Sequence, residues 1–423
     1  MNDKVKKILG LKEGHFLAAL FIVALILRVA YTLFLRRYIG REILHDEIKY
    51  LELAKDLLES GNYGDSYLSD QAHYTPGYPI FLYAIYNTYG VSILLAGFLN
   101  SLFSALIPPL IYLMASRFAD YKAAALASAI AVFDPYFLYY SPLLLTETLL
   151  AFLPLLSLLL LFISLEKDSY IYLALSALVM GISTMVNPVT LPFPLIFMLY
   201  LLLQRGLVFK KFIKQSIVYL VFFSAVMTPW AVRNYFVFGT PVLTTSNTGK
   251  TFYGSNHFSS RRTNANMGTY LFGWNDFAKY FKCGDPFDEL SMDRKMFKAG
   301  LTELKDNYTK IPYLELRKFI NFWGVRPDPT KEKWTLNDSL SLCTYGIILI
   351  FFVIGFFKTF KPRDKIFIFH LMILLYTALA LVFWGTPRFR FPVSPYIIIL
   401  SSMVIVALYD SYMSKLRTTN QNV

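Results

Sequence analysis

Two neighbouring stretches near the start of the chain decide its fold class. The first, HFLAALFIVALILRVAYTLF (residues 15–34), is apolar almost throughout, and the second, HDEIKYLELAKDLLESGNYG (residues 45–64), repeats apolar side chains at helical spacing. The first is long enough to cross a hydrocarbon core about 30 Å thick. It is also too long for a removable signal peptide and lacks a small-residue cleavage site. The second predicts an amphipathic helix that stops at Gly61 and lies near the membrane surface.

The rest of the chain is equally apolar. Hydrophobic residues make up 56% of the 423 positions and charged residues only 16%, a composition that excludes an ordinary soluble domain. Windows of about 20 apolar residues predict about ten membrane spans and an all-α integral membrane protein. The predicted spans lie near residues 15–35, 91–115, 121–140, 144–165, 169–187, 190–204, 214–235, 339–358, 365–384 and 391–411.

Lysine and arginine in the short loops predict the orientation. The formal net charge is +13, but the basic residues gather in short gaps between apolar runs, as expected at an anionic membrane surface rather than for a nucleic-acid partner. Both termini are therefore predicted in the cytoplasm, most simply at a plasma (inner) membrane. Two long segments, about 37–90 and 239–338, fall outside. We expect three regions: a transmembrane module (1–238), an outer subdomain (239–338) and C-terminal spans (339–423).

Four acidic residues are expected at the outer surface: Asp46, Glu47, Asp134 and Glu147. Asp46 precedes the amphipathic helix, where it would serve as an N-cap or as a general base or metal ligand. Glu147 begins an apolar helix, where an ionisable group is costly unless it is paired or used. Asp134 precedes Pro135, and Asp-Pro also forms ordinary turns. Convergence of the four side chains at one depth would make an acidic site.

Other polar residues are expected on the same side. Arg388 and Arg390 lie in the short turn WGTPRFRFP, against the inside preference of the other short loops, although flanking arginines also reach to lipid headgroups. Arg233 near a helix end could pair with an acidic residue or with phospholipid. His73 and His257 could join the carboxylates on a divalent metal or be plain loop residues, and Tyr74 beside His73 is a further candidate substrate contact.

Six segments carry a family resemblance in this order: residues 45–64, TPGYPIFLYAIY (75–86), FDPYFLYYSPLLLTETL (133–149), NPVTLPFPLI (187–196), residues 228–256 and TPRFRFPVSPY (386–396). The resemblance extends over most of the chain, from the first span to the last. The set resembles the GT-C glycosyltransferases, in particular the group of protein O-mannosyltransferases and lipid A aminoarabinose transferases (glycosyltransferase family 39, PMT-2-like).

The resemblance implies an inverting enzyme that moves a sugar from a polyprenyl or dolichyl phosphate to a protein, lipid or glycan outside. It implies that Asp46 is the catalytic carboxylate and that Glu47 orients the loop or tunes Asp46. The leaving lipid phosphate needs cations, for which Arg388, Arg390 and Arg233 are candidates. No cofactor is certain, and a divalent metal ion is the one candidate.

The chain departs from the family at two points. Relatives commonly carry Arg or Lys just before the Pro-Gly turn, where this chain has Tyr74-Thr75. Many have Arg-Pro where this chain has Asn187-Pro188. Loss of these basic positions puts the carrier contacts in question, and it is compatible with a different sugar or lipid.

The long segment 239–338 fits no span and is expected to cover the donor cleft. Its aromatic residues Tyr253, Tyr270 and Trp274 could stack on sugars or serve in packing. A rival function is a transporter or flippase of lipid-linked sugars, although repeated halves with broken helices are not evident.

Overall fold

The computed structural model describes residues 13–35, 45–64, 71–204, 208–258, 267–271, 288–328 and 333–421. Within these ranges the secondary structure is helical, with no β-strand, as expected for an all-α membrane protein. Trp274 lies outside them. The first half contains α2 (Glu13–Phe34), α3 (His45–Glu59), α4 (Gly77–Tyr89), α5 (Ile93–Ala115), α6 (Tyr121–Phe133), α7 (Pro135–Tyr140), α8 (Glu147–Lys167), α9 (Tyr170–Val186), α10 (Phe193–Leu203) and α11 (Phe209–Phe238).

The second half begins with the outer helices and ends with apolar ones. It contains α12 (Thr248–Asn256), α14 (Glu289–Asp306), α15 (Ile311–Trp323), α16 (Leu336–Ser341), α17 (Ile347–Thr359), α18 (Phe367–Val382), α19 (Pro387–Arg390) and α20 (Ser394–Gln421). Six helices of the described chain are long and apolar enough to cross a membrane, and four shorter apolar helices accompany them. All ten windows predicted from hydropathy coincide with one of these helices, while the number that crosses a bilayer stays a prediction.

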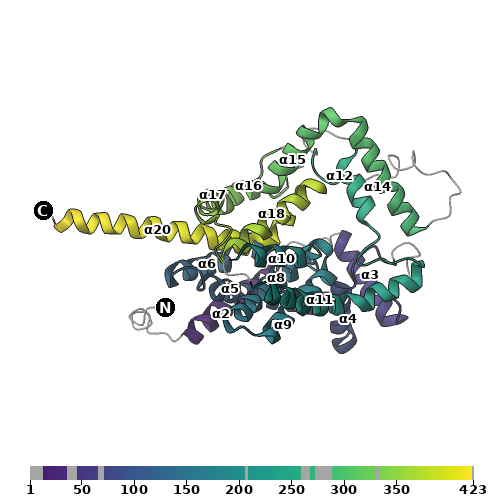
Figure 1. The fold of residues 1–423 in the computed structure, drawn as a ribbon, viewed down its shortest axis with the longest axis horizontal. Helices are drawn as coiled ribbons and strands as arrows, with labels where there is room; N and C mark the ends of the chain where they lie inside the picture. Colours follow the sequence, from purple (N-terminus) through teal and green to yellow (C-terminus); the bar gives the residue numbers. More distant parts are fainter. Residues whose placement is uncertain are drawn as a thin grey trace.

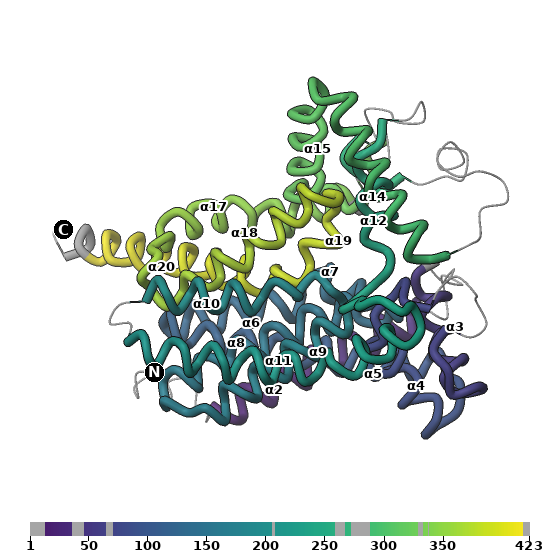
Figure 2. The backbone as a smooth tube through the Cα atoms, turned by 45° about the vertical axis from the view of Figure 1, so that its right-hand side comes forward, coloured from purple at the N-terminus to yellow at the C-terminus, as the bar shows by residue number. Residues whose placement is uncertain are grey.

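The long helices pack side by side into one bundle, and the polar elements gather at one of its ends (Figure 1). α3 and α4 lie at that end, and α12, α14 and α15 project from the same part of the molecule (Figure 2). α20 reaches out at the opposite end. The first outer segment and the subdomain at 239–338 are therefore neighbours, as expected. The side of the membrane that they face stays a prediction.

The amphipathic helix α3 forms as its spacing predicts. Its apolar face buries Tyr50, Leu53 and Ala54 in the main core. Gly61 follows with a φ of +73°, a left-handed conformation that favours glycine and ends the helix. One expectation is corrected: α3 already begins at His45, so Asp46 lies within the first helical turn rather than before it.

The Pro-Gly turn before α4 depends on a close backbone contact. A Cβ atom on Gly77 would lie 2.5 Å from the carbonyl carbon and oxygen of Met185, at the end of α9. Only a residue without a side chain lets α4 approach α9 this closely. The turn therefore sets where the first outer segment meets the bundle.

Gly77→Ala is expected to destabilise the protein by about 1–3 kcal/mol, because the added methyl group forces the two backbones apart. Thermal unfolding of the purified protein in detergent measures the effect. Gly14→Ala is the matched control, since a Cβ there meets nothing within 4 Å. Equal midpoints for the two variants would contradict the contact.

Candidate active site

A single guanidinium joins two of the predicted acidic residues. Arg388 donates from Nη1 to Oδ2 of Asp46 at 2.7 Å and from Nε to Oε1 of Glu147. The three side chains come from α19, α3 and α8, and Arg388 and Asp46 are 342 positions apart in sequence. Asp46 and Arg388 are about one-third exposed, at 34% and 30%, whereas Glu147 is 4% exposed. The cluster of three side chains is therefore partly exposed at Asp46 and buried at Glu147.

Both carboxylates occupy the first turn of a helix. Asp46 is in the first turn of α3, and Glu147 is the first residue of α8. Backbone N–H groups at a helix N-terminus carry partial positive charge, which attracts a carboxylate there. The two helix ends therefore place both carboxyl groups on either side of Arg388.

Two atoms of this cluster have no hydrogen-bond partner among the described residues. Oε2 of Glu147 is buried without a partner. Arg388 directs Nε and Nη1 at the carboxylates, and none of its hydrogen bonds to described residues uses Nη2. The Arg388 side chain is 30% exposed, and a guanidinium N–H is a strong donor to a phosphate oxygen.

Aromatic residues surround the cluster. Burial raises the pKa of Tyr50, and the charges of Asp46 and Glu147 raise it further, so this hydroxyl stays protonated. Burial also raises the pKa of Tyr270 in the outer subdomain, with a further contribution from Asp46. The Tyr270 ring packs on Trp384 at 4.9 Å between centroids, and Trp384 packs on Phe389 at 4.8 Å. The outer segment therefore brings aromatic rings to the Asp46 side; stacking of Tyr270 on a sugar stays a prediction, and Trp384 was not predicted.

Glu47 has a different task from its neighbour. Its buried carboxylate accepts a hydrogen bond from the backbone N–H of Leu144 at 2.6 Å. Leu144 lies in the short connection that leads into Glu147. Glu47 thus anchors α3 to the segment that supplies the second carboxylate, while its role in the reaction stays a prediction.

Glu47→Gln is expected to retain most activity, because the amide oxygen can still accept from Leu144. Glu47→Ala leaves that buried N–H unpaired, which costs about 1–3 kcal/mol, and should lower both stability and transfer rate. Steady-state kinetics and thermal unfolding of the two variants make the comparison. If Glu47→Gln and Glu47→Ala lost similar amounts of activity and stability, the negative charge of Glu47 would matter rather than its hydrogen bond.

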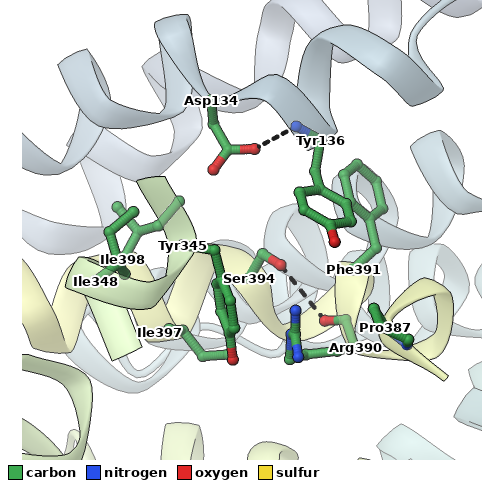
Figure 3. Close-up of a pocket in the computed structure, with 10 residues that line it drawn as sticks. All are labelled: Asp134, Tyr136, Tyr345, Ile348, Pro387, Arg390, Phe391, Ser394, Ile397 and Ile398. Carbon is green, nitrogen blue, oxygen red and sulfur yellow. Dashed lines mark hydrogen bonds between the residues drawn. The ribbon is translucent and has the colours of Figure 1, made fainter. Parts of the chain in front are cut away.

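Asp134 and Arg390 meet elsewhere. Asp134 caps α7 by accepting from the backbone N–H groups of Tyr136 and Phe137 at 2.8 and 3.1 Å. It lines a small pocket together with Arg390 and Tyr345 (Figure 3). The Arg390 guanidinium lies over the Tyr345 ring, 3.6 Å from its centroid, and donates to the carbonyl of Gly324 at 3.0 Å. The expected four-carboxylate cluster is thus divided, with Asp134 capping a helix beside Arg390 and Glu47 bound to the backbone.

The remaining candidates contact the loops around the site. Arg233 donates to the carbonyls of Gln71 and Tyr63 at 2.7 and 2.8 Å, so it braces the first outer segment. His73 packs on Tyr74 with ring centroids 4.7 Å apart. His257 stacks on Tyr253, whose carbonyl lies 3.0 Å from Nδ1. Among the described residues no group of three His, Cys, Asp or Glu side chains could hold a metal, and the metal stays a prediction.

Sequence reasoning missed two buried basic residues. Arg28 in α2 is fully buried and donates to Ser104 at 2.7 Å and to the Ala131 carbonyl at 3.2 Å, near the end of α6. Lys318 in α15 is also fully buried. Arg28 could have been noticed, because it is a single arginine inside an apolar run. Lys318 lies in an ordinary amphipathic pattern, which gives no sign that it is buried.

Comparisons with known proteins bear on this arrangement. Residues 73–231, from the turn before α4 into α11, match the family model described as dolichyl-phosphate-mannose-protein mannosyltransferase. The helical fold is similar to solved structures of an archaeal oligosaccharyltransferase, AglB, from Archaeoglobus fulgidus. Over residues 73–231 the chain is similar to the mannosyltransferase family, and over most of its length it shares the fold of the oligosaccharyltransferase. No curated protein is a significant match to the sequence.

The solved GT-C structures are distant in sequence. AglB in complex with an inhibitory peptide and a dolichol-phosphate is 14% identical, with a TM-score of 0.52 over 95% of this chain and 52% of its own. An oligosaccharyltransferase from Archaeoglobus fulgidus, tethered to an acceptor peptide containing the NVT sequon, is 14% identical, with a TM-score of 0.56 over 94% of this chain and 50% of its own. This chain spans about half the length of those proteins. At this identity the likeness establishes the GT-C fold alone.

Proposed function

We propose that this GT-C protein is an inverting glycosyltransferase that moves a sugar from a polyprenyl phosphate, of the dolichyl or undecaprenyl type, to a protein, lipid or glycan acceptor. The reaction would take place on the extracytoplasmic side of a plasma (inner) membrane. The observation that carries the proposal is Arg388, held between Asp46 and Glu147 at the polar end of the helical bundle. A base and a phosphate-binding cation are the two groups that such a transfer needs.

Asp46 is suited to be the base. Its carboxylate is one-third exposed, so an acceptor hydroxyl can reach it. The hydroxyl oxygen forms a bond to C1 of the sugar while the bond from C1 to the phosphate oxygen breaks. The proton passes to Asp46, and the electron pair leaves with the polyprenyl phosphate. Displacement in one step from the opposite face inverts the configuration at C1.

Arg388 is suited to bind the leaving phosphate through its Nη2 edge. Before the reaction, two carboxylates compete for its charge. When Asp46 takes the proton, its attraction for the guanidinium weakens at the moment that charge grows on the phosphate. The positive charge of Arg388 then becomes more available to the leaving group, which is stabilisation specific to the transition state.

The experiment uses purified protein reconstituted in vesicles, radiolabelled sugars on dolichyl and undecaprenyl phosphate, and a membrane extract as the acceptor pool. We expect label to move to an acceptor, free polyprenyl phosphate to appear, and the transferred sugar to have the inverted anomeric configuration by NMR. Donors that cross the bilayer intact, with no product on any carrier, would instead favour a transporter of lipid-linked sugars.

A further inference from the structure

The turn that carries Arg388 is held by the outer subdomain. α18 ends at Val382 and α19 starts at Pro387, so a short connection determines where the guanidinium points. The last carbonyls of a helix lack partners within it and carry partial negative charge. Figure 1 shows this end of α18 beside α12 and α15, which belong to the outer subdomain.

Lys318 and Asn256 bind those carbonyls. Nζ of Lys318 donates to the carbonyl of Leu381 at 2.6 Å, to Oδ1 of Asn256 at 2.7 Å and to Oε1 of Glu315 at 2.8 Å. Nδ2 of Asn256 donates to the carbonyl of Val382 at 3.1 Å. Because Lys318 is fully buried, its charge acts on these partners with little screening by water.

Backbone contacts continue along the turn. The N–H of Gly385 donates to the carbonyl of Gly268 at 3.0 Å. A Cβ on Gly385 would lie 1.9 Å from the carbonyl oxygen of Lys318. One on Gly268, whose φ is +82°, would lie 2.7 Å from the N–H nitrogen of Lys318. Both glycines therefore permit the turn to lie directly against α15.

The far end of the turn is bound to the same helix. Arg390 donates to the carbonyls of Phe322 and Gly324, where α15 ends. Arg388 thus sits between two attachments to the outer subdomain. We call Asn256, Gly268 and Lys318 the outer clamp.

We propose that the outer clamp positions Arg388 against Asp46 and Glu147, with Lys318 as its central positioning residue. A ligand that shifts α15 would then shift the guanidinium. An effect of the clamp on sugar transfer rests on the proposed function. The mechanical link, by which the clamp holds the turn at residues 383–390, does not. Misplacement of a catalytic group by about 1 Å lowers rates by as much as 10²-fold.

Hydrogen exchange of the full-length protein in detergent tests the mechanical link without any substrate. Lys318→Met removes the charge, and Gly385→Ala pushes the turn from α15 without removing any charged group. Amides of residues 383–390 should exchange about tenfold faster in both variants, with those of α8 unchanged. Lys298→Met, at an exposed position of α14, is the control. Unchanged exchange in the turn of folded Gly385→Ala protein would overturn the proposal.

A double-mutant cycle separates positioning from general stability. Gly385→Ala should lower kcat about tenfold in the wild-type background and have little further effect in the Arg388→Gln background, because the two changes act through one group. An equal loss in both backgrounds would overturn the positioning role. If the wild-type protein transfers no sugar, the proposed function fails, and the exchange experiment still decides whether the clamp holds the turn.

Discussion

Asp46→Asn is expected to lower kcat for sugar transfer by about 10²- to 10⁴-fold, the range for loss of a general base. The amide oxygen of Asn can still accept the hydrogen bond from Nη1 of Arg388, so the site should keep its arrangement. What the substitution removes is the ability to take the acceptor's proton. The fold should therefore change little, and the affinity for the polyprenyl phosphate should not fall, because Arg388 then pairs with one carboxylate instead of two.

Two measurements on the purified protein distinguish loss of the base from loss of binding: the steady-state rate of sugar transfer and the affinity for the carrier lipid alone. Glu52→Gln is the matched control, because Glu52 lies on the same helix and pairs with Lys49. Its rate should equal that of the wild type. A folded Asp46→Asn protein that transfers sugar at the wild-type rate would exclude Asp46 as the base.

Arg388→Gln is expected to lower kcat by about 10²- to 10³-fold, comparable to the loss of one donor that stabilises a developing negative charge. It should also raise KM for the donor, since the proposed contact between the guanidinium and the phosphate already forms in the donor complex. Arg388→Lys should recover only part of the rate, because an ammonium cannot bind two carboxylates and a phosphate through one planar group.

The loss of Arg388 has a second consequence at Glu147. Glu147 is almost completely buried and is paired with Arg388, so removal of the cation leaves a buried charge without its partner. Arg388→Gln should therefore also lower the unfolding midpoint, as removal of one member of a buried pair does. Arg294→Gln, at an exposed position of α14, is the control. An unchanged KM with a normal kcat would rule out phosphate binding by Arg388.

Much of the fold could be predicted from local sequence. The apolar run at 15–34 and the amphipathic repeat at 45–64 both formed the expected helices, because burial of an apolar face depends on residues within one or two turns of each other. Gly61 ended α3 for an equally local reason. With Asp46 as the cap, α3 would begin at Glu47; it begins two residues earlier, at His45, so Asp46 lies in the first turn.

The pairing inside the site depended on tertiary structure. Arg388 and Arg390 share one short motif and were equal candidates for the phosphate. Residues two apart on a helix point to nearly opposite sides, so α19 turns one toward Asp46 and the other toward Tyr345. Which of them faces the carboxylates is decided by how α15 and the outer clamp hold the turn.

The sequence by itself determined the fold class, the polar end of the bundle and the acidic residues expected there, because hydrophobic periodicity and helix signals act over short distances. Only the tertiary structure decided that Asp46 and Glu147 share Arg388, that Asp134 serves as a cap, and that Lys318 is buried. Those contacts join residues far apart in the chain, and their energy depends on burial and geometry that no local pattern contains.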